Sequence, residues 1–412
     1  MKYLLVIGDG MADNPVPELS GKTPIEAANK PCMDALAAKG EFGTVRTIPE
    51  GMAPGSESGI LTIFGYDPRT YLRGRSPLEA ASCGVLLKED EISYRCNMVS
   101  LGGDGPLSQR SMRSHSTDSI SGEDSIALLH YLLADERFAQ ATRRHGFCFH
   151  ETPSFRHILV QKGGSIDGFN ATPPHDILGQ AVSEYLPTGT GSEALRELME
   201  LSVEILANAP LNAQRESNGL LRADGIWPWA AGAATILPPF SEKYGKSGSV
   251  ISGAPLVQGI AILAGMEAPN VEGATGTIDT NYAGKVAAAC DALKTHDFVC
   301  IHIEAPDECT HCGDLEGKIN SITYVDQLVL APMIKTLEDG TEPFRVLVMP
   351  DHKTLMKTLT HDADPVPYFI YDSQSDKGSG LAYSEAFAAK TGIHVENGHT
   401  LMERLFETGK AD

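Results

Sequence analysis

The chain has 412 residues, of which 42% are hydrophobic and 21% are charged, a balance that is ordinary for a globular protein with a large core. Its formal net charge is -21, from 33 basic and 54 acidic residues. This charge argues against broad electrostatic binding to nucleic acid or to an anionic membrane, but it permits an anionic small substrate held by local cations.

The amino-terminal segment, MKYLLVIGDGMAD, has too short an apolar run for a signal peptide. No later run reaches the ~18 apolar residues of a membrane span, so we expect a cytoplasmic protein. Eight cysteines without framework spacing indicate free thiols in a reducing compartment. Cys309 and Cys312 flank His311 and could be redox-active or half of a zinc site, but no second pair completes such a site.

The first predicted strand runs from Tyr3 to Ile7 and ends at Asp9, which lies between two glycines. Asp9 could be a plain turn residue, because its glycine neighbours favour a turn. A helix is predicted next, from Pro24 to Lys39, with Gly40 at its end.

A loop of small residues from Met52 to Gly59 then leads into the apolar segment Ile60 to Phe64. Ser56 lies in this loop, at the head of an expected helix, where backbone N–H groups are free and the helix dipole is positive. It could therefore be a nucleophile toward phosphorus. It could equally be the N-cap of the helix.

The pattern changes near Arg95, where clustered glycines precede alternating helical and strand-like segments. The elements expected there are helices at 125–133 and 192–207 and a strand at 155–160. We interpret residues 93–245 as an α/β cap domain. It is inserted into a domain that consists of residues 1–92 and 246–412.

The alternating α/β pattern resumes after the insertion. The expected elements are a strand at 249–251, helices at 255–264 and 281–294, and a buried strand at 298–303. The last strand leads directly to Asp307 and His311, whose i, i+4 spacing places them on one face of a helical turn. An exposed helix contact is the alternative, but the position at the end of an apolar strand favours a site.

The last strand considered, Val346 to Met349, is apolar and is stopped by Pro350, as expected for a strand buried on both faces of a parallel sheet. Such sheets bind ligands at the carboxyl ends of their strands. Asp351 and His352 follow this strand and offer an oxygen and a nitrogen to a divalent metal. They could also form a surface turn with a salt-bridged aspartate.

Three apolar strands thus deliver Asp or His at their carboxyl ends, and a serine and a histidine lie in nearby loops. The set is Asp9, Ser56, Asp307, His311, Asp351, His352 and His361. It is too large for one four-coordinate metal and about right for two. Mixed oxygen and nitrogen ligands fit Mn²⁺, Zn²⁺ or Co²⁺ better than Mg²⁺ or Ca²⁺.

Sequence motifs along almost the whole chain resemble the archaeal-type branch of the cofactor-independent phosphoglycerate mutases, in the alkaline phosphatase superfamily. They are GDGMAD, KTPIEAANKP, APGSES with GYDP, GRSPLEAA, GATGTIDTNYAGK, HIEAPDECTHCGDLEGK, PDHKT and HDADPVPY. The resemblance implies an alkaline-phosphatase-like three-layer α/β/α domain with a mainly parallel sheet, and an inserted α/β cap.

The resemblance also implies roles for the candidate residues. One metal would be held by Asp307, His311 and His361, and the other by Asp9, Ser56, Asp351 and His352, with Ser56 as nucleophile. The implied reaction interconverts 3-phosphoglycerate and 2-phosphoglycerate through a phosphoserine, without 2,3-bisphosphoglycerate.

A small phosphorylated carboxylic acid needs cations, which this acidic chain supplies only locally. Arg156 and His157, in the short apolar strand of the expected cap, are the first candidates to bind it. Arg75, in Gly74-Arg75-Ser76-Pro77, is a further candidate for the same role.

The chain departs from the family pattern at two positions. Trp229 stands in the segment 225–232 where many archaeal members have arginine, and Ser247 stands where a lysine is expected, with Lys246 one position earlier. The family residues would be substrate-side cations. A bacterial branch with a similar Trp-x-Trp segment is proposed as a homoserine kinase, which is the alternative interpretation, and a metal-dependent phosphatase is another.

Overall fold

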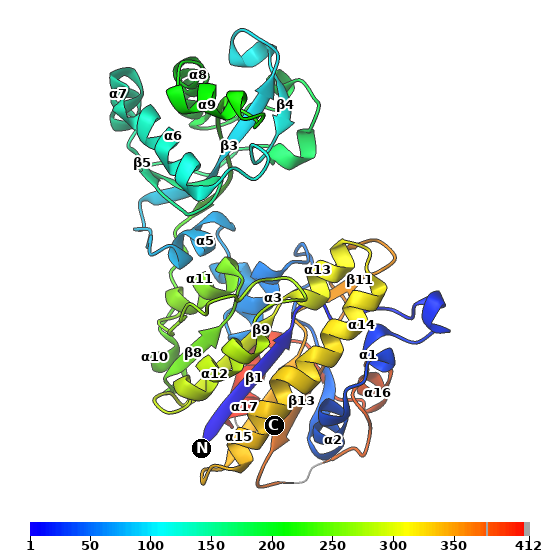
Figure 1. Ribbon diagram of the computed structural model, residues 1–412. Coiled ribbons are helices and arrows are strands. Elements are labelled where there is room, and N and C mark those ends of the chain that lie inside the picture. Colours follow the sequence, from blue (N-terminus) through cyan, green and yellow to red (C-terminus); the bar gives the residue numbers. More distant parts are fainter. Residues whose placement is uncertain (376–377, 408–412) are drawn as a thin grey trace. The chain divides into compact units, whose positions relative to one another are not determined.

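The computed structural model describes residues 1–375 and 378–407 (Figure 1). The chain forms two compact units, the first from Met1–Leu72 and Ile236–Asp412 and the second from Arg73–Thr235. The sequence analysis expected boundaries at 92/93 and 245/246. The earlier start of the second unit has a structural reason, since α5 (Ser76–Ser82) packs on two strands of that unit, β3 (Glu91–Gly102) and β7 (Gly225–Ala233).

The first unit is built on a seven-stranded sheet with the order β14-β2-β13-β10-β1-β9-β8. Its strands are β1 (Lys2–Gly8), β2 (Glu41–Val45), β8 (Gly248–Ile251), β9 (Phe298–Ile303), β10 (Phe344–Met349), β13 (Val366–Asp372) and β14 (His394–Val395). A separate hairpin pairs β11 (Lys353–Leu355) with β12 (Thr360–Asp362).

The four adjacent strands β8, β9, β1 and β10 run parallel, whereas β13 is antiparallel to both of its neighbours. All residues of β9 and β10 are buried, as expected for strands covered on both faces. The predicted α/β class with a mainly parallel central sheet is therefore confirmed. Ile7 of β1 lies opposite His302 on one side and Met349 on the other.

Helices cover this sheet, and Figure 1 shows α12, α14 and α15 across its near face. The helices of the first unit are α1 (Pro24–Ala27), α2 (Pro31–Lys39), α3 (Ser56–Ile63), α4 (Pro68–Tyr71), α10 (Phe240–Tyr244), α11 (Pro255–Leu263), α12 (Tyr282–Ala292), α13 (Ala305–His311), α14 (Leu315–Tyr324), α15 (Ala331–Glu338), α16 (Glu385–Lys390) and α17 (Leu401–Phe406). The ring of Phe406 in α17 packs against Tyr3 and Phe298 of the sheet.

The single helix predicted from Pro24 to Lys39 is wrong, because two helices occupy this segment. α1 begins with a capping box at Thr23 and ends at Ala27, and α2 begins at Pro31. Pro31 has no N–H to continue the hydrogen-bond ladder and disfavours helical conformation in the residue before it, so the helix breaks there. The expected end at Gly40 is confirmed.

The second unit contains a five-stranded sheet in which β4, β3, β6 and β5 lie in that order and β7 also pairs with β3. The strands are β3 (Glu91–Gly102), β4 (Ser111–Ser114), β5 (Phe147–His150), β6 (Arg156–Lys162) and β7 (Gly225–Ala233). The remaining helices are α6 (Gly122–Ala134), α7 (Glu136–Arg144), α8 (Ser192–Leu206) and α9 (Pro210–Ser217). The two helices and the strand expected in this region correspond to α6, α8 and β6.

A large apolar core fills the second unit between its sheet and its helices. It includes both tryptophans, Trp227 and Trp229, which lie on β7. In the described part of the chain, no helix has the length and apolar character needed to cross a bilayer.

Candidate metal centre

The candidate ligands of the first unit gather at the carboxyl edge of its parallel strands. Asp9 follows β1 directly, and Asp351 comes two residues after the end of β10. Asp307 lies in α13, which begins two residues after β9 ends. Because β9, β1 and β10 are adjacent and parallel, these three carboxylates meet at one edge of the sheet.

The first ligand group consists of Asp307, His311 and His361, which offer ligand atoms within 4.8 Å of one another. The single turn of α13 places His311 Nε2 3.1 Å from Asp307 Oδ2. His361 comes from β12, with its Nε2 3.0 Å from His311 Nε2 and 3.5 Å from Asp307 Oδ1. These distances suit donors that converge on one cation.

Hydrogen bonds orient this group for metal binding. His311 Nδ1 lies 2.8 Å from the carbonyl oxygen of Leu359, which can only accept, so Nδ1 carries the proton and Nε2 is available as a ligand. A hydrogen bond with Asp307 raises the pKa of His311 to about 9. Burial acts to raise the pKa of Asp307, but hydrogen bonds from His311 and His361 outweigh it and hold that pKa well below its usual range.

The second ligand group joins Asp9, Asp307 and His352, again with donor atoms within 4.8 Å. His352 Nε2 lies 3.5 Å from Asp9 Oδ1 and 3.3 Å from Asp351 Oδ2. It also lies 3.2 Å from Ser56 Oγ. Through these contacts with His352, Asp351 and Ser56 extend the second ligand group, so the predicted ligand set lies in two neighbouring groups that share Asp307.

Two carboxylate oxygens of the second group are buried without a hydrogen-bond partner in the described part of the chain, Asp9 Oδ1 and Asp351 Oδ2. Burial raises the pKa of Asp9 well above its usual range, and the nearby charges of Asp351 and Asp307 raise it further. Clustered buried carboxylates are costly unless a cation compensates them. The donor set and its two unpartnered oxygens therefore fit divalent metal ions.

Ser56 is the first residue of α3, and the N-cap position is occupied by Gly55. The alternative that Ser56 is itself the N-cap does not match this geometry. Its Oγ points instead toward the second ligand group. Gly59, one turn further along α3, makes this possible, because a Cβ atom there would lie 2.7 Å from the carbonyl oxygen of Asp351.

Two polar residues that were not predicted from the sequence contact the candidate ligands. His302 Nε2 lies 2.9 Å from Asp9 Oδ2, and Thr354 Oγ1 donates to Asp307 Oδ1. A sequence signal existed for both. His302 is the only polar side chain in β9, and Thr354 lies two residues after His352.

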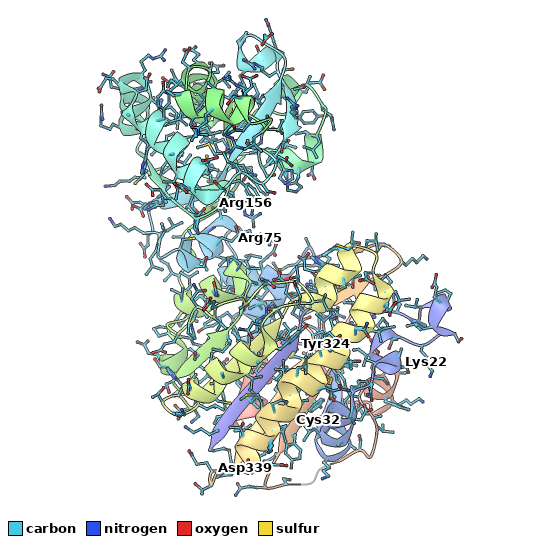
Figure 2. All side chains as sticks on the ribbon, in the orientation of Figure 1. Lys22, Cys32, Arg75, Arg156, Tyr324 and Asp339 are labelled. Atoms are coloured by element: carbon cyan, nitrogen blue, oxygen red, sulfur yellow. The ribbon has the colours of Figure 1, made fainter. Side chains whose placement is uncertain are left out.

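The second unit holds a cluster of three arginines around one carboxylate. Arg95 and Arg75 both pair with Glu79, the latter at 3.3 Å, and Arg156 Nη1 lies 3.9 Å from it. Figure 2 shows Arg75 and Arg156 close to each other, and Arg75 helps to lower the pKa of Arg156, after burial, to about 10. The side chain of Arg156 remains 27% exposed, so it is available to an anion.

Trp229, the first departure from the family pattern, belongs to this arginine cluster. The guanidinium groups of Arg95 and Arg156 lie 4.8 and 5.3 Å from the centre of its ring. Trp229 Nε1 and Arg156 Nε also donate to the same Asn97 oxygen. Trp229 therefore holds two arginine side chains in place, and the region keeps its cations although it lacks the family arginine.

The second departure, Ser247, lies at the amino end of β8, where it hydrogen bonds with Asp297. The ammonium of Lys246 lies 5.7 Å from the ring of Tyr3, at the start of β1. The candidate ligands occupy the opposite, carboxyl edge of the same sheet. The expectation that this position faces the substrate is therefore not supported by its place in the fold.

His157 lies in the interior of the second unit and is 1% exposed. Its Nδ1 accepts from the N–H of Thr152 at 3.2 Å, and its Nε2 lies 2.9 Å from Ser125 Oγ. Both ring nitrogens are thus engaged within the unit. A role of His157 in substrate binding remains a prediction, but its contacts are those of a core residue.

Similarity to known proteins covers the full length of the chain. A family model described as 2,3-bisphosphoglycerate-independent phosphoglycerate mutase matches residues 37–212. A probable 2,3-bisphosphoglycerate-independent phosphoglycerate mutase of Geobacter sulfurreducens is 41% identical over 409 residues, which are 99% of this chain and 100% of that protein. The corresponding mutase of Methanothrix thermoacetophila is 42% identical over 407 residues, 98% of this chain and 99% of its own.

Solved structures share the same fold. A protein from Pyrococcus horikoshii aligns with a TM-score of 0.79 at 26% identity, over 100% of this chain and 98% of that one. The cofactor-independent phosphoglycerate mutase from Thermoplasma acidophilum aligns with a TM-score of 0.65 at 22% identity, over 99% of both chains. At 22% identity, the likeness shows the fold alone.

Proposed function

The chain belongs to the family of 2,3-bisphosphoglycerate-independent phosphoglycerate mutases, and we propose that it interconverts 3-phosphoglycerate and 2-phosphoglycerate through phosphorylation of Ser56. The observation that carries this proposal is the position of Ser56 Oγ, 3.2 Å from His352 Nε2 at the head of α3. A serine among clustered Asp and His ligands has the surroundings of an activated nucleophile.

The ligand set fits two divalent cations, for which Mn²⁺, Zn²⁺ and Co²⁺ are the candidates. Asp307, His311 and His361 would hold one, and Asp9, Ser56, Asp351 and His352 the other. When bound, the metal ions would stabilise the alkoxide of Ser56 and offset the charge of the transferring phosphoryl group.

In the proposed reaction, Ser56 Oγ forms a bond to phosphorus as the bond from phosphorus to the substrate oxygen breaks. The hydroxyl of Ser56 gives up its proton, and the glycerate oxygen that leaves takes one. The other glycerate hydroxyl then attacks the phosphoserine, which restores the free serine. Ser56 is well placed for this exchange because α3 holds it firmly through the close contact of Gly59 with Asp351.

The arginine cluster of the second unit is our candidate for binding the acidic groups of the substrate. Arg156 and Arg75 supply guanidinium groups, which bind carboxylates and phosphates in a bidentate manner. The stacking of Arg156 on Trp229 would hold its guanidinium in one orientation.

The alternative functions are a homoserine kinase and a metal-dependent phosphatase. The named relatives favour the mutase over both. Trp229 suggested the kinase, but its ring has another role in this structure, since Arg95 and Arg156 stack on it.

Replacement of Ser56 by Ala tests the proposal directly. We expect mutase activity of the metal-loaded protein to fall by at least roughly a thousandfold, because loss of a catalytic nucleophile removes the covalent route. Ser58→Ala is the matched control, since Ser58 is a buried serine of the same helix and is outside the ligand set. It should retain most of the activity.

Rapid quenching of the wild-type protein with 3-phosphoglycerate, followed by mass spectrometry, should find one phosphoryl group on the peptide that carries Ser56. Labelling only with ATP and homoserine would favour the kinase. Release of free phosphate without 2-phosphoglycerate would favour the phosphatase. Normal activity of Ser56→Ala would refute the proposal.

A further inference from the structure

Thr354 is a buried residue of the hairpin strand β11, and it touches a member of each candidate ligand group. Its Oγ1 lies 2.5 Å from Asp307 Oδ1 and 3.1 Å from His352 Nδ1. We propose that the Thr354 hydroxyl is a positioning group that orients ligands of both metal sites at once. The inference rests on the metal centre of the proposed function.

The hydrogen positions at Thr354 follow from its neighbours. His352 Nδ1 also lies 3.3 Å from the carbonyl oxygen of Lys353, which can only accept, so the proton of a neutral ring is on Nδ1. Thr354 Oγ1 then accepts from His352 and must donate its own hydrogen to Asp307. One hydroxyl therefore leaves His352 Nε2 free to bind metal and also fixes the rotation of the Asp307 carboxylate.

Thr354 is itself held in place by a buried ion pair. Lys318 Nζ donates to the carbonyl oxygen of Thr354 at 2.5 Å and to Asp13 Oδ2 at 2.9 Å. Asp13 Oδ2 also accepts from the N–H of Met356 at 3.0 Å. The backbone at and after Thr354 is thereby tied to α14, which fixes the position of its Cα beside the ligands.

Gly10 provides the space that brings Thr354 and Asp307 together. A Cβ atom at this position would overlap Thr354 Oγ1 and would lie 2.6 Å from Asp307 Oδ1. The backbone of Gly10 also has φ +58°, a conformation that favours glycine. The turn after β1 is thus shaped around the hydrogen bond between Thr354 and Asp307.

His302 is a useful comparison because, in the described part of the chain, Asp9 of the second group is the one candidate ligand with which its side chain hydrogen bonds. Its Nε2 contacts Asp9 Oδ2, and its Nδ1 lies 3.1 Å from Ser252 Oγ, which already accepts from the N–H of Ala254. A carboxylate oxygen of Asp9 can only accept, so the ring proton of His302 lies on Nε2, and Nδ1 accepts from the hydroxyl of Ser252. Loss of this ring should weaken the second site, whereas loss of the Thr354 hydroxyl should weaken both.

The experiment compares Thr354→Val, which keeps the shape but not the hydroxyl, with Thr354→Ser, which keeps the hydroxyl. Mn²⁺ binding to the metal-stripped proteins is measured by calorimetry and by the electron paramagnetic resonance signal of free Mn²⁺. We expect Thr354→Val to weaken both sites by roughly 10- to 100-fold, the usual effect of removing a residue that orients metal ligands. Thr354→Ser should remain within about threefold of wild type, and His302→Leu should weaken one site only.

Several outcomes would overturn the inference while leaving the proposed function intact. They are two-site binding by Thr354→Val as tight as wild type, weakening of one site only, or equal losses in the Ser and Val variants, which would indicate packing. If Thr354→Val does not unfold cooperatively, Thr354→Ala provides the same deletion. Failure of the wild-type protein to bind any of Mn²⁺, Zn²⁺ and Co²⁺ would instead refute the metal centre itself.

Discussion

The histidines of this protein differ in which ring nitrogen their hydrogen-bond partners leave available. His311 and His352 each point Nδ1 at a carbonyl oxygen, so their Nε2 atoms face the candidate metal sites. His302 carries its proton on Nε2 and orients an aspartate instead. His157 has both nitrogens engaged in the core of the second unit. The hydrogen-bond partners of each histidine therefore determine whether its Nε2 atom is available to a metal ion or whether the ring orients another residue.

The buried side chain of His157 should make the stability of the second unit depend on pH. Burial lowers its pKa to about 4 from the usual 6.5. Between these values the unfolded chain binds the proton and the folded one does not, so the second unit should lose stability as pH falls from 6.5 towards 4. The loss should approach about 3 kcal/mol, since one pKa unit corresponds to about 1.4 kcal/mol.

Tryptophan fluorescence during urea unfolding measures this loss in one unit, because both tryptophans of the chain lie in β7 of the second unit. The control is His157→Gln, whose side-chain amide can hydrogen bond but cannot titrate in this range. It should be less stable near pH 7 and should show a flatter dependence between pH 4 and 6.5. An unchanged slope in this variant would assign the acid sensitivity to other groups.

Two short helices carry much of the geometry of the metal centre. α13 places Asp307 and His311 on one turn, directly after β9. α3 presents Ser56 at its first residue and packs its Gly59 against the chain at Asp351. The close approach of α3 is possible only without a side chain at Gly59, so this helix packs tightly on the segment after β10 and presents Ser56 beside it.

Gly59→Ala tests this support. In an unconstrained helix the change would be favourable by up to about 1 kcal/mol. Here the new Cβ would lie 2.7 Å from a backbone oxygen of Asp351, which cannot move as a flexible side chain can. We expect the free energy of unfolding of the first unit to fall by about 1–3 kcal/mol through overpacking. The affinity of the second metal site should fall with it, and calorimetry measures both.

The matched control for this prediction is Thr62→Val, one turn further along α3. Thr62 Oγ1 is buried and has no hydrogen-bond partner among residues 1–375 and 378–407, so an isosteric methyl should be neutral or stabilising. A stable Gly59→Ala variant with normal metal affinity would show that α3 can shift at no cost.

The two units of the chain carry different clusters of charged and metal-ligating side chains. The first unit holds the clustered carboxylates and histidines, and the second holds the arginine cluster around Glu79. A chain with a net charge of -21 thus places its candidate anion-binding arginines in one unit and its candidate metal ligands in the other. Each unit has its own sheet and can be followed separately.

Removal of metal should therefore destabilise the first unit selectively. Chelation leaves the carboxylates of Asp9, Asp307 and Asp351 without a compensating cation. We expect calorimetry to show a lower unfolding temperature for the first unit, while the tryptophan transition of the second unit stays in place. Mn²⁺ at about 100 times its Kd should restore roughly 2.7 kcal/mol for each site that it fills. Equal shifts of both transitions would contradict this prediction.

Local patterns in the sequence predicted the four parallel strands of the first unit, β1, β8, β9 and β10, and most of the candidate ligands. The apolar runs at 298–303 and 346–349 predicted β9 and β10, and the i, i+4 spacing of Asp307 and His311 predicted their shared helical turn. These features depend on near neighbours along the chain. The break between α1 and α2 at Pro31 also has a local cause, because proline has no N–H to continue the helix, and it was therefore predictable from the sequence.

Only the tertiary structure decided which residues support the site. His302 lies 293 positions from Asp9, and Thr354 lies 47 from Asp307, and both pairs meet because of the order of parallel strands and the fold of the hairpin. Likewise, Trp229 meets Arg156 through the sheet of the second unit. Strand order and side-chain direction depend on packing of the whole unit, so contacts between distant polar residues cannot be derived from periodicity or spacing along the chain.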